Sequence, residues 1–388
     1  MKSKIILGLG YGDEGKGLVT AYHAEQAQQK NETALVIRFS GGQQAGHTVV
    51  SGTQRHVFSS FGSGTLADIP TYWSSYCTFD SAVFWREGQA LKERELEPIV
   101  YVDGLAPVTT PYDVFANRSR ERDLRHGSCG MGVGATYARM EGPYKLFVQD
   151  LMYPEVLKLR LAAIRKYYEN RAMLSPDWEE KEQLFLYAVS EVVEQVQIIQ
   201  EQHFFSAYNF DNYIFEGSQG ILLDMDHGFF PHVTRSRTSS CQALELIRRN
   251  GLPKPELYYV TRAYQTRHGN GPLTNETLAL SLKPTPLETN QYNEWQGEQR
   301  RSVLDAEMLN YALQCDANYA GGHEKHLVVT CLDQLKEGLS ITVEGERFEL
   351  SSAQNLSAYL NTNFKSVMES WSDRSAALRE DITAVIAE

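Results

Sequence analysis

The sequence predicts an α/β fold in which helices surround a large, mostly parallel sheet, with a phosphate-binding loop after the first strand. Short apolar runs recur along the chain, each run ends in a polar or glycine-rich loop, and no Gly/Ser or Pro linker divides the 388 residues. Strands buried on both faces give such continuous apolar runs, and ligands bind at the carboxyl ends of parallel strands. We therefore expect a single elaborated domain over residues 1–388.

The first expected elements form a β–loop–α–β unit. Residues 4–7 are a short apolar strand, residues 18–28 have helical periodicity, and residues 34–39 are a second apolar strand. The further expected strands are 98–102, 213–215, 257–260 and 327–329. Residues from 154 to about 202 are charged and helix-periodic, so we expect a helical insertion there that acts as scaffold.

Charge and cysteine content limit the partners of the chain. A formal net charge of −12 argues against nucleic acid and anionic membranes, which attract clustered Lys and Arg. Five cysteines without a CxxC pair fit a reducing compartment. No apolar stretch approaches the ~18 residues of a membrane span, and the N-terminus lacks a signal-peptide pattern. We expect a cytoplasmic protein whose ligands are small molecules.

The glycine-rich loop at residues 8–17, GLGYGDEGKG, connects the first strand to the first helix. Backbone N–H groups and the helix dipole can hold phosphate in this setting, and Lys16 completes a GxxxxGK pattern. Gly17, however, stands where a conventional loop has Ser or Thr for magnesium. Asp13 can ligate magnesium instead, and it can also accept a proton from a substrate. The alternative is that Asp13 and Glu14 merely favour a helix N-terminus.

A second polar loop, SGGQQAGHT at residues 40–48, follows the second expected strand. Its histidine, His47, can donate a hydrogen bond to a developing oxyanion or to a transferring phosphoryl group. Considered alone, the loop fits a surface histidine in a turn equally well. Asp13 and His47 are therefore the candidate catalytic residues.

The two loops together resemble those of the adenylosuccinate synthetase family, which read GDEGKG and GG-x-x-AGHT. The resemblance continues through GSCGMGVG at 127–134, FEGSQG at 215–220, VT at 233–234, TRHGNGP at 266–272 and TCLD at 330–333. It implies the fold of that family and a ligase reaction on a 6-oxopurine nucleotide. In that reaction a nucleoside triphosphate phosphorylates the 6-oxygen, and the amine of L-aspartate then displaces the phosphate.

The resemblance also implies residue roles. Asp13 would remove the proton from purine N1, His47 would stabilise the 6-oxygen, and the Asp13 carboxylate and Gly46 carbonyl would hold Mg²⁺. The residues implied to bind the triphosphate are Gly12, Glu14, Gly15, Lys16, Gly17, Gly46, His47, Thr48 and Asp333. The residues implied to surround the purine nucleotide are Asp13, Gln44, Ser128, Cys129, Arg139, Gln219 and Thr234. Because Arg139 would reach the substrate of a neighbouring subunit, the resemblance implies a homodimer.

Several positions depart from the family pattern. Ser128-Cys129 replaces a Thr-Thr pair, Gln44 replaces an Asn, and Cys331 replaces the Lys of the last motif. Ser-Cys-Gly at 128–130 and Asn-Glu-Trp-Gln-Gly at 293–297 resemble the bacteriophage branch, the 2-aminoadenylosuccinate synthetases, which use dGMP. The retained Asp13 departs from that branch. We therefore expect the purine substrate to be dGMP and not IMP.

The triphosphate and aspartate sites also depart from the family. Residues 370–374, SWSDR, lack the Gly-Pro of the triphosphate base pocket, which leaves both ATP and GTP as donors. The arginine-rich aspartate loop is replaced by NEWQGEQRR at 293–301. Arg300 and Arg301 are the candidates there, because guanidinium groups pair well with carboxylates.

Three competing hypotheses remain. The first is a conventional adenylosuccinate synthetase that uses IMP and GTP. The second is a non-catalytic nucleotide-binding switch, which would explain residues 8–17 and Asp333 but not the second loop. The third is a dehydrogenase, which is weaker because the first loop does not complete GxGxxG. Turnover that requires aspartate would separate a ligase from a switch.

Overall fold

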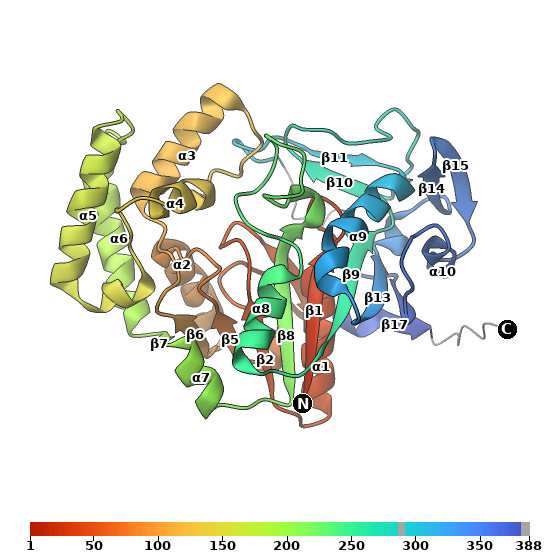
Figure 1. Ribbon diagram of the computed structural model, residues 1–388, viewed down its shortest axis with the longest axis horizontal. Helices are drawn as coiled ribbons and strands as arrows, with labels where there is room; N and C mark the ends of the chain where they lie inside the picture. The colour runs from red at the N-terminus through yellow and green to blue at the C-terminus, as the bar shows by residue number, and fades with distance from the viewer. Residues whose placement is uncertain (286–291, 382–388) are drawn as a thin grey trace.

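The computed structural model describes residues 1–285 and 292–381. Across these residues ten strands form one sheet in the order β17-β16-β13-β9-β1-β8-β2-β5-β6-β7 (Figure 1). In that order they span Leu378–Asp381, Ser366–Ser370, Glu324–Thr330, Pro255–Arg262, Lys2–Gly8, Asn212–Gly220, Ala34–Arg38, Thr71–Trp73, Val100–Asp103 and Gln197–Ile199. All neighbouring strands are parallel except β16 and β17. The predicted large, mostly parallel sheet is confirmed.

The central strands bury side chains on both faces. Ile5 of β1 belongs to the hydrophobic cluster that contains residues of α8 (Cys241–Asn250) and α9 (Ala306–Ala320). The next residue, Ile6, belongs to the opposite cluster, which contains residues of α1 (Lys16–Gln29). Successive side chains of a strand point to opposite faces, so two-sided burial produces the continuous apolar run that the sequence shows.

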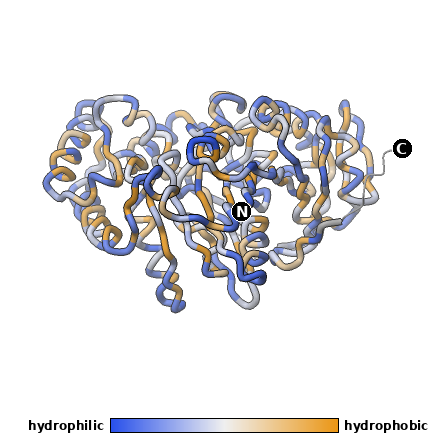
Figure 2. The backbone as a smooth tube through the Cα atoms, turned by 60° about the horizontal axis from the view of Figure 1, so that its bottom comes forward, coloured by the Kyte–Doolittle hydropathy of each residue, from blue (hydrophilic) through white to orange (hydrophobic). Residues whose placement is uncertain are grey.

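Helices gather at the β7 end of the sheet (Figure 1). They are α2, α3, α4, α5 and α6, spanning Ser81–Lys92, Pro111–Leu124, Val133–Met140, Pro154–Glu169 and Trp178–Val193. Orange and blue alternate along the helices at the left end of Figure 2, as expected where one helical face is buried. Among the described residues, no helix is both long and apolar enough to cross a membrane.

The predicted helical segment 154–202 is interrupted by a strand. It contains α5 and α6, but Gln197–Ile199 form β7, which pairs in parallel with β6, and α7 (Glu201–Ala207) follows. A strand of three residues is too short to show a period-two pattern, so neighbouring β6 defines it more than its own sequence does.

Smaller elements lie beyond the carboxyl ends of the main strands. β3 (His47–Ser51) and β4 (Gln54–Phe58) form a hairpin after β2, and β10 (Gln265–His268) follows β9 and pairs with β11 (Gln299–Ser302). The remaining elements are β12 (Leu304–Asp305), β14 (Leu339–Val343), β15 (Glu346–Leu350), α10 (Ala353–Ser357) and the 3₁₀ turns η1 (Thr65–Ala67), η2 (Val148–Met152), η3 (Ile221–Leu223), η4 (Leu332–Gln334) and η5 (Ser375–Ala377). This arrangement brings distant loops to one edge of the sheet.

Candidate active site

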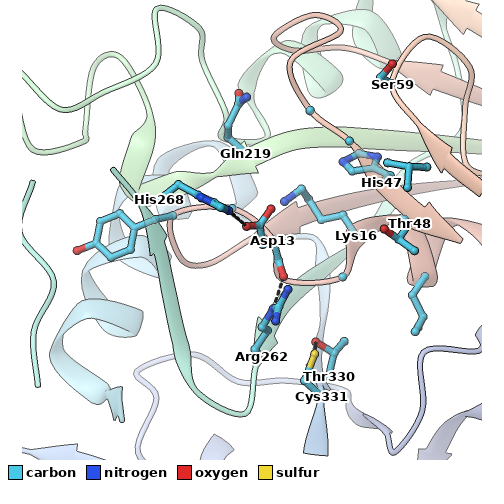
Figure 3. A pocket seen from close by; sticks show the side chains of 18 of the residues that line it. Asp13, Lys16, His47, Thr48, Ser59, Gln219, Arg262, His268, Thr330 and Cys331 are labelled. Carbon is cyan, nitrogen blue, oxygen red and sulfur yellow. Dashed lines mark hydrogen bonds and ion pairs between the residues drawn. The ribbon is translucent and has the colours of Figure 1, made fainter. Parts of the chain in front are cut away.

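A cavity of about 680 Å³ lies at the carboxyl ends of β1, β2, β8, β9 and β13 (Figure 3). Its walls come from loops that are far apart in the sequence. The predicted site residues that line it are Gly12, Asp13, Gly15, Lys16, Gly17, Gln44, Gly46, His47, Thr48, Cys129, Gln219 and Asp333. The fold therefore brings most of the predicted triphosphate and purine residues into one cavity, as expected for the strand ends of an α/β sheet.

The loop from 8 to 17 is shaped around the buried side chain of Glu14. Its Oε1 accepts hydrogen bonds from the backbone N–H groups of Gly10 (3.0 Å) and Gly12 (2.8 Å), and its Oε2 pairs with Lys16 Nζ at 2.5 Å. A Cβ at Gly8 would lie 2.2 Å from the same carboxylate. Glu14 thus acts within the loop and does not line the cavity, whereas Lys16 does.

Asp13 is held from several directions. Its backbone has a positive φ of 65°, and its carbonyl oxygen accepts a hydrogen bond from Arg262 Nε at 2.5 Å. Its Oδ2 lies 2.9 Å from His268 Nε2 and 3.2 Å from Gln299 Nε2. Burial raises the pKa of Asp13, but the His268 hydrogen bond and the nearby cationic groups outweigh burial and lower it. The carboxylate is therefore ionised and able to accept a proton.

His47 is oriented by a carboxylate behind it. Its Nδ1 lies 2.7 Å from Oε1 of the fully buried Glu216, which also accepts hydrogen bonds from Ser63 and lies 4.0 Å from Arg38 Nη1. Burial opposes ionisation of Glu216, but these partners hold its pKa at about 2. An ionised carboxylate accepts hydrogen bonds only, so Nδ1 carries the hydrogen and Nε2 is left for ligands.

The protonation state of His47 depends on what occupies the cavity. Burial lowers its pKa more than Glu216 raises it, so the ring alone favours the neutral form, whose Nε2 is an acceptor. An anion in the cavity favours the doubly protonated ring, whose Nε2 donates. A nucleotide phosphate would thus create the donor that an oxyanion needs.

Replacing Glu216 with Gln is expected to lower kcat by up to about 100-fold, because a neutral amide no longer stabilises the protonated His47 ring that donates through Nε2. That effect stays at or below the 10²–10³-fold cost of deleting a preorganised donor. Steady-state kinetics with saturating substrates measures it. Glu87→Gln is the matched control, since Glu87 is also buried beside a histidine, His56, but neither residue lines the cavity. Equal loss in both variants would contradict the role of Glu216.

Gln44, Gln219 and Cys129, which the resemblance implies for the purine nucleotide, all line the cavity. Gln44 Nε2 donates to Gln219 Oε1 at 3.3 Å. Gln44 Oε1 is buried without a partner among the described residues, so it is available to a ligand. Ser128 is not one of the residues that line the cavity, and its hydroxyl is hydrogen-bonded to Asn117.

Asp333 also lines the cavity, in the 3₁₀ turn after β13. Burial raises its pKa, and the Asp373 carboxylate adds to the rise. Asp373, Ser372 and Cys331 line the same part of the cavity. Two residues of the segment 370–374, Ser372 and Asp373, therefore line the same cavity as Asp333, and the Asp373 carboxylate is close enough to act on the pKa of Asp333.

Arg139 is not brought to the cavity. It is 1% exposed, its Nε and Nη2 pair with the Asp113 carboxylate at 2.9 and 3.0 Å, and its remaining donors reach the carbonyls of Val108 and Tyr144. This pair would have to break before Arg139 could reach a neighbouring subunit. Thr234 also lies outside the cavity wall, and its backbone N–H donates to the Leu223 carbonyl at 2.8 Å.

The two aspartate-binding candidates point in different directions from β11. Arg300 donates to the carbonyls of Gly269 and Gly271 and pairs with Glu276 at 2.9 Å. Arg301 shares a strand face with Gln299, whose side-chain oxygen accepts from it at 2.9 Å. Neither arginine lines the cavity, but Arg301 lies on the face that reaches Asp13.

Four polar residues at the site had no role assigned from the sequence: Glu216, Arg262, His268 and Gln299. The first three lie inside or beside recognised motifs, but their partners come from other loops. Gln299 faces His268 in the antiparallel pair β10–β11, and neither strand shows the apolar alternation that would predict it from the sequence. Two further lining residues, Asn293 and Gln296, come from the loop before β11.

A glycine-rich loop of the phosphate-binding type, an ionised carboxylate and a histidine oriented by a second carboxylate line one cavity, an arrangement that suits an enzyme acting on nucleotides. Residues 5–382 match the sequence model of the family described as adenylosuccinate synthetase. The chain belongs to this family of carbon–nitrogen ligases. The family assignment made from the loops is confirmed.

Individual relatives show the same relationship. The chain is 29% identical to the adenylosuccinate synthetase of Halobacterium salinarum over 368 residues, covering 88% of this chain and 81% of that protein. It is 27% identical to that of Bordetella avium over 368 residues, covering 89% and 81%.

Two solved structures share the fold. The fully ligated adenylosuccinate synthetase from Plasmodium falciparum has a TM-score of 0.77 at 18% identity, covering 97% of this chain and 99% of that one. The cyanophage S-2L succinoaminodeoxyadenylate synthetase bound to dGMP and dATP has a TM-score of 0.65 at 16% identity, covering 98% and 95%. At these identities the likeness shows the fold alone.

Proposed function

We propose that this ligase joins L-aspartate to C6 of dGMP through a 6-phosphoryl intermediate, giving an N6-succinyl-2-amino-dAMP product. The main observation behind this proposal is that Asp13, His47, Lys16 and Gln219 line one cavity. Gln44 and Cys129, which differ from the family pattern, line the same cavity. These altered side chains favour a purine other than that of the conventional enzyme. The dGMP in the cyanophage neighbour agrees with this proposal.

The proposed chemistry has two steps. Asp13 takes the N1 proton as the 6-oxygen attacks the γ-phosphorus of the triphosphate, and the diphosphate leaves with the bridging oxygen. The α-amine of L-aspartate then adds to C6, loses a proton, and expels inorganic phosphate. His47 donates to the 6-oxygen while negative charge develops there, and Lys16 holds the transferred phosphoryl group.

Magnesium fits the oxygen donors of the cavity wall. The Asp13 carboxylate and the Gly46 carbonyl would hold Mg²⁺, which neutralises phosphate charge when bound. Asp333 and Asp373 would face the base of the donor nucleotide, for which ATP and GTP are the two candidates. Of the two arginines proposed for L-aspartate, Arg301 is better placed because it shares a face with Gln299.

We also propose that the chain acts as a homodimer in the cytoplasm. Val156 and Leu159 lie three residues apart on α5 and are 37% and 74% exposed, and Met152, at the end of η2 just before α5, is 54% exposed. An exposed apolar stripe of this kind suits a second copy of the chain. The five cysteines are free thiols, in keeping with a reducing compartment. Sedimentation of the intact chain tests the dimer.

The substrate assignment predicts a clear kinetic preference. Phosphate release is measured with Mg²⁺, L-aspartate and either ATP or GTP, comparing dGMP, GMP and IMP, and product mass is confirmed. We expect kcat/KM for dGMP to exceed that for IMP by about tenfold or more, the equivalent of about 1.4 kcal/mol in transition-state binding. Preference for IMP would support the conventional adenylosuccinate synthetase instead. Nucleotide hydrolysis that ignores aspartate would support a switch.

A further inference from the structure

His268 and Gln299 converge on one oxygen of Asp13. His268 is the last residue of β10 and Gln299 the first of β11, and the two face each other across the antiparallel ladder. Directly opposed residues of such a ladder project to the same face. Both side chains reach Asp13 Oδ2, at 2.9 and 3.2 Å, and Figure 3 shows the His268 ring directed at this carboxylate.

Two donors on Oδ2 leave Oδ1 for ligands of the cavity. Gln299 Nε2 donates to Oδ2, and a hydrogen on His268 Nε2, 2.9 Å away, gives this oxygen its second donor. Nδ1 of His268 is buried and has no partner within the described residues. The polar interaction of the ring is therefore its hydrogen bond to Asp13, and no second anchor competes for its orientation.

The backbone of Asp13 is fixed as well. Its positive φ and the hydrogen bond from Arg262 to its carbonyl oxygen set where the side chain begins. Rotation of the carboxylate is the remaining freedom, and the pair on Oδ2 removes it. A base must lie within hydrogen-bond reach of the proton that it takes, and a displacement of about 1 Å can cost 10²-fold in rate.

We propose that His268, supported by Gln299, is a positioning residue that holds Asp13 with Oδ1 toward the purine N1–H. This inference deepens the proposed function and rests on it. In this role His268 only donates a hydrogen bond to Oδ2, while Asp13 Oδ1 receives the proton from N1. His268 lies inside the TRHGNGP motif at 266–272, but no role for this histidine was predicted from the sequence.

Two substitutions and one control test the kinetic consequence. His268→Leu removes the donor, His268→Gln keeps an N–H donor, and His203→Leu removes an exposed histidine of α7 that does not line the cavity. For His268→Leu we expect kcat to fall about 10²-fold with little change in KM for the purine nucleotide. His268→Gln should recover most of the loss, and His203→Leu should match the unaltered chain. Thermal melts confirm that each variant is folded.

These measurements distinguish a failure of the positioning role from a failure of the proposed function. If the unaltered chain turns over and His268→Leu has the same kcat, or His268→Gln is as slow as His268→Leu, the positioning role is wrong. If the unaltered chain shows no aspartate-dependent turnover, the proposed function is wrong.

The contact between His268 and Asp13 can also be tested by spectroscopy, without measuring turnover. In ¹⁵N-histidine-labelled protein, the His268 signal, identified by its loss in His268→Gln, should show a hydrogen on Nε2. Asp13→Asn should alter this signal and leave that of His203 unchanged. An Nδ1–H tautomer, or a signal insensitive to Asp13→Asn, would overturn the proposal.

Discussion

Asp13→Asn is expected to lower kcat by about 10²–10⁴-fold, the usual contribution of a positioned general base. Asparagine has nearly the same shape and tolerates the positive φ of 65° at this position. It can also retain the hydrogen bond from His268. What it loses is the ability to take the N1 proton, so the fold should survive while the first chemical step fails.

The measurement compares aspartate-dependent phosphate release in Asp13→Asn and the unaltered chain, with nucleotide affinity determined separately by calorimetry. Asp68→Asn is the matched control, because Asp68 also has a positive φ, 56°, but is exposed and outside the cavity. We expect the control to keep full turnover. Asp13→Asn with unchanged kcat would show that another group takes the proton.

The central sheet could be predicted because its longer strands appear in the sequence as apolar runs. Residues 4–7 and 34–39 are apolar except for Lys4 and Arg38, and they form most of β1 and β2, whose side chains enter hydrophobic clusters on both faces of the sheet. Thr71–Trp73 and Gln197–Ile199 carry no such signal, because each has three residues and is defined by the strand beside it. Local sequence sets long buried strands, whereas tertiary pairing sets short ones. The single domain over 1–388 stays a prediction.

The site residues that could be predicted from the sequence are those that belong to contiguous motifs. Lys16 and His47 belong to glycine-rich loops, and both line the cavity. Glu216 and His268 act through partners more than 160 residues away in the chain, as their bonds to His47 and Asp13 show. The direction of Arg300 could not be predicted either, because it depends on the register of β11 against β10.

Arg139→Met is expected to lower the free energy of unfolding by about 3–5 kcal/mol, the usual cost of leaving one partner of a buried ion pair unpaired. Asp113 is fully buried, and besides Arg139 it is bonded to Tyr168 and to Thr110 at the start of α3. Methionine fills similar space but offers no donor. Urea unfolding measures the change.

Replacing both partners decides whether Arg139 serves its own subunit. In Arg139→Met with Asp113→Leu no buried charge is left alone, so much of the stability should return. A role across a dimer interface predicts the opposite pattern: Arg139→Met would unfold at the same urea concentration as the unaltered chain but lose turnover. Mixing it with Asp13→Asn would then restore activity, because one site of a mixed dimer would combine an intact Asp13 with an intact Arg139 from the partner. The bidentate pair with Asp113 favours the loss of stability, with no recovery on mixing.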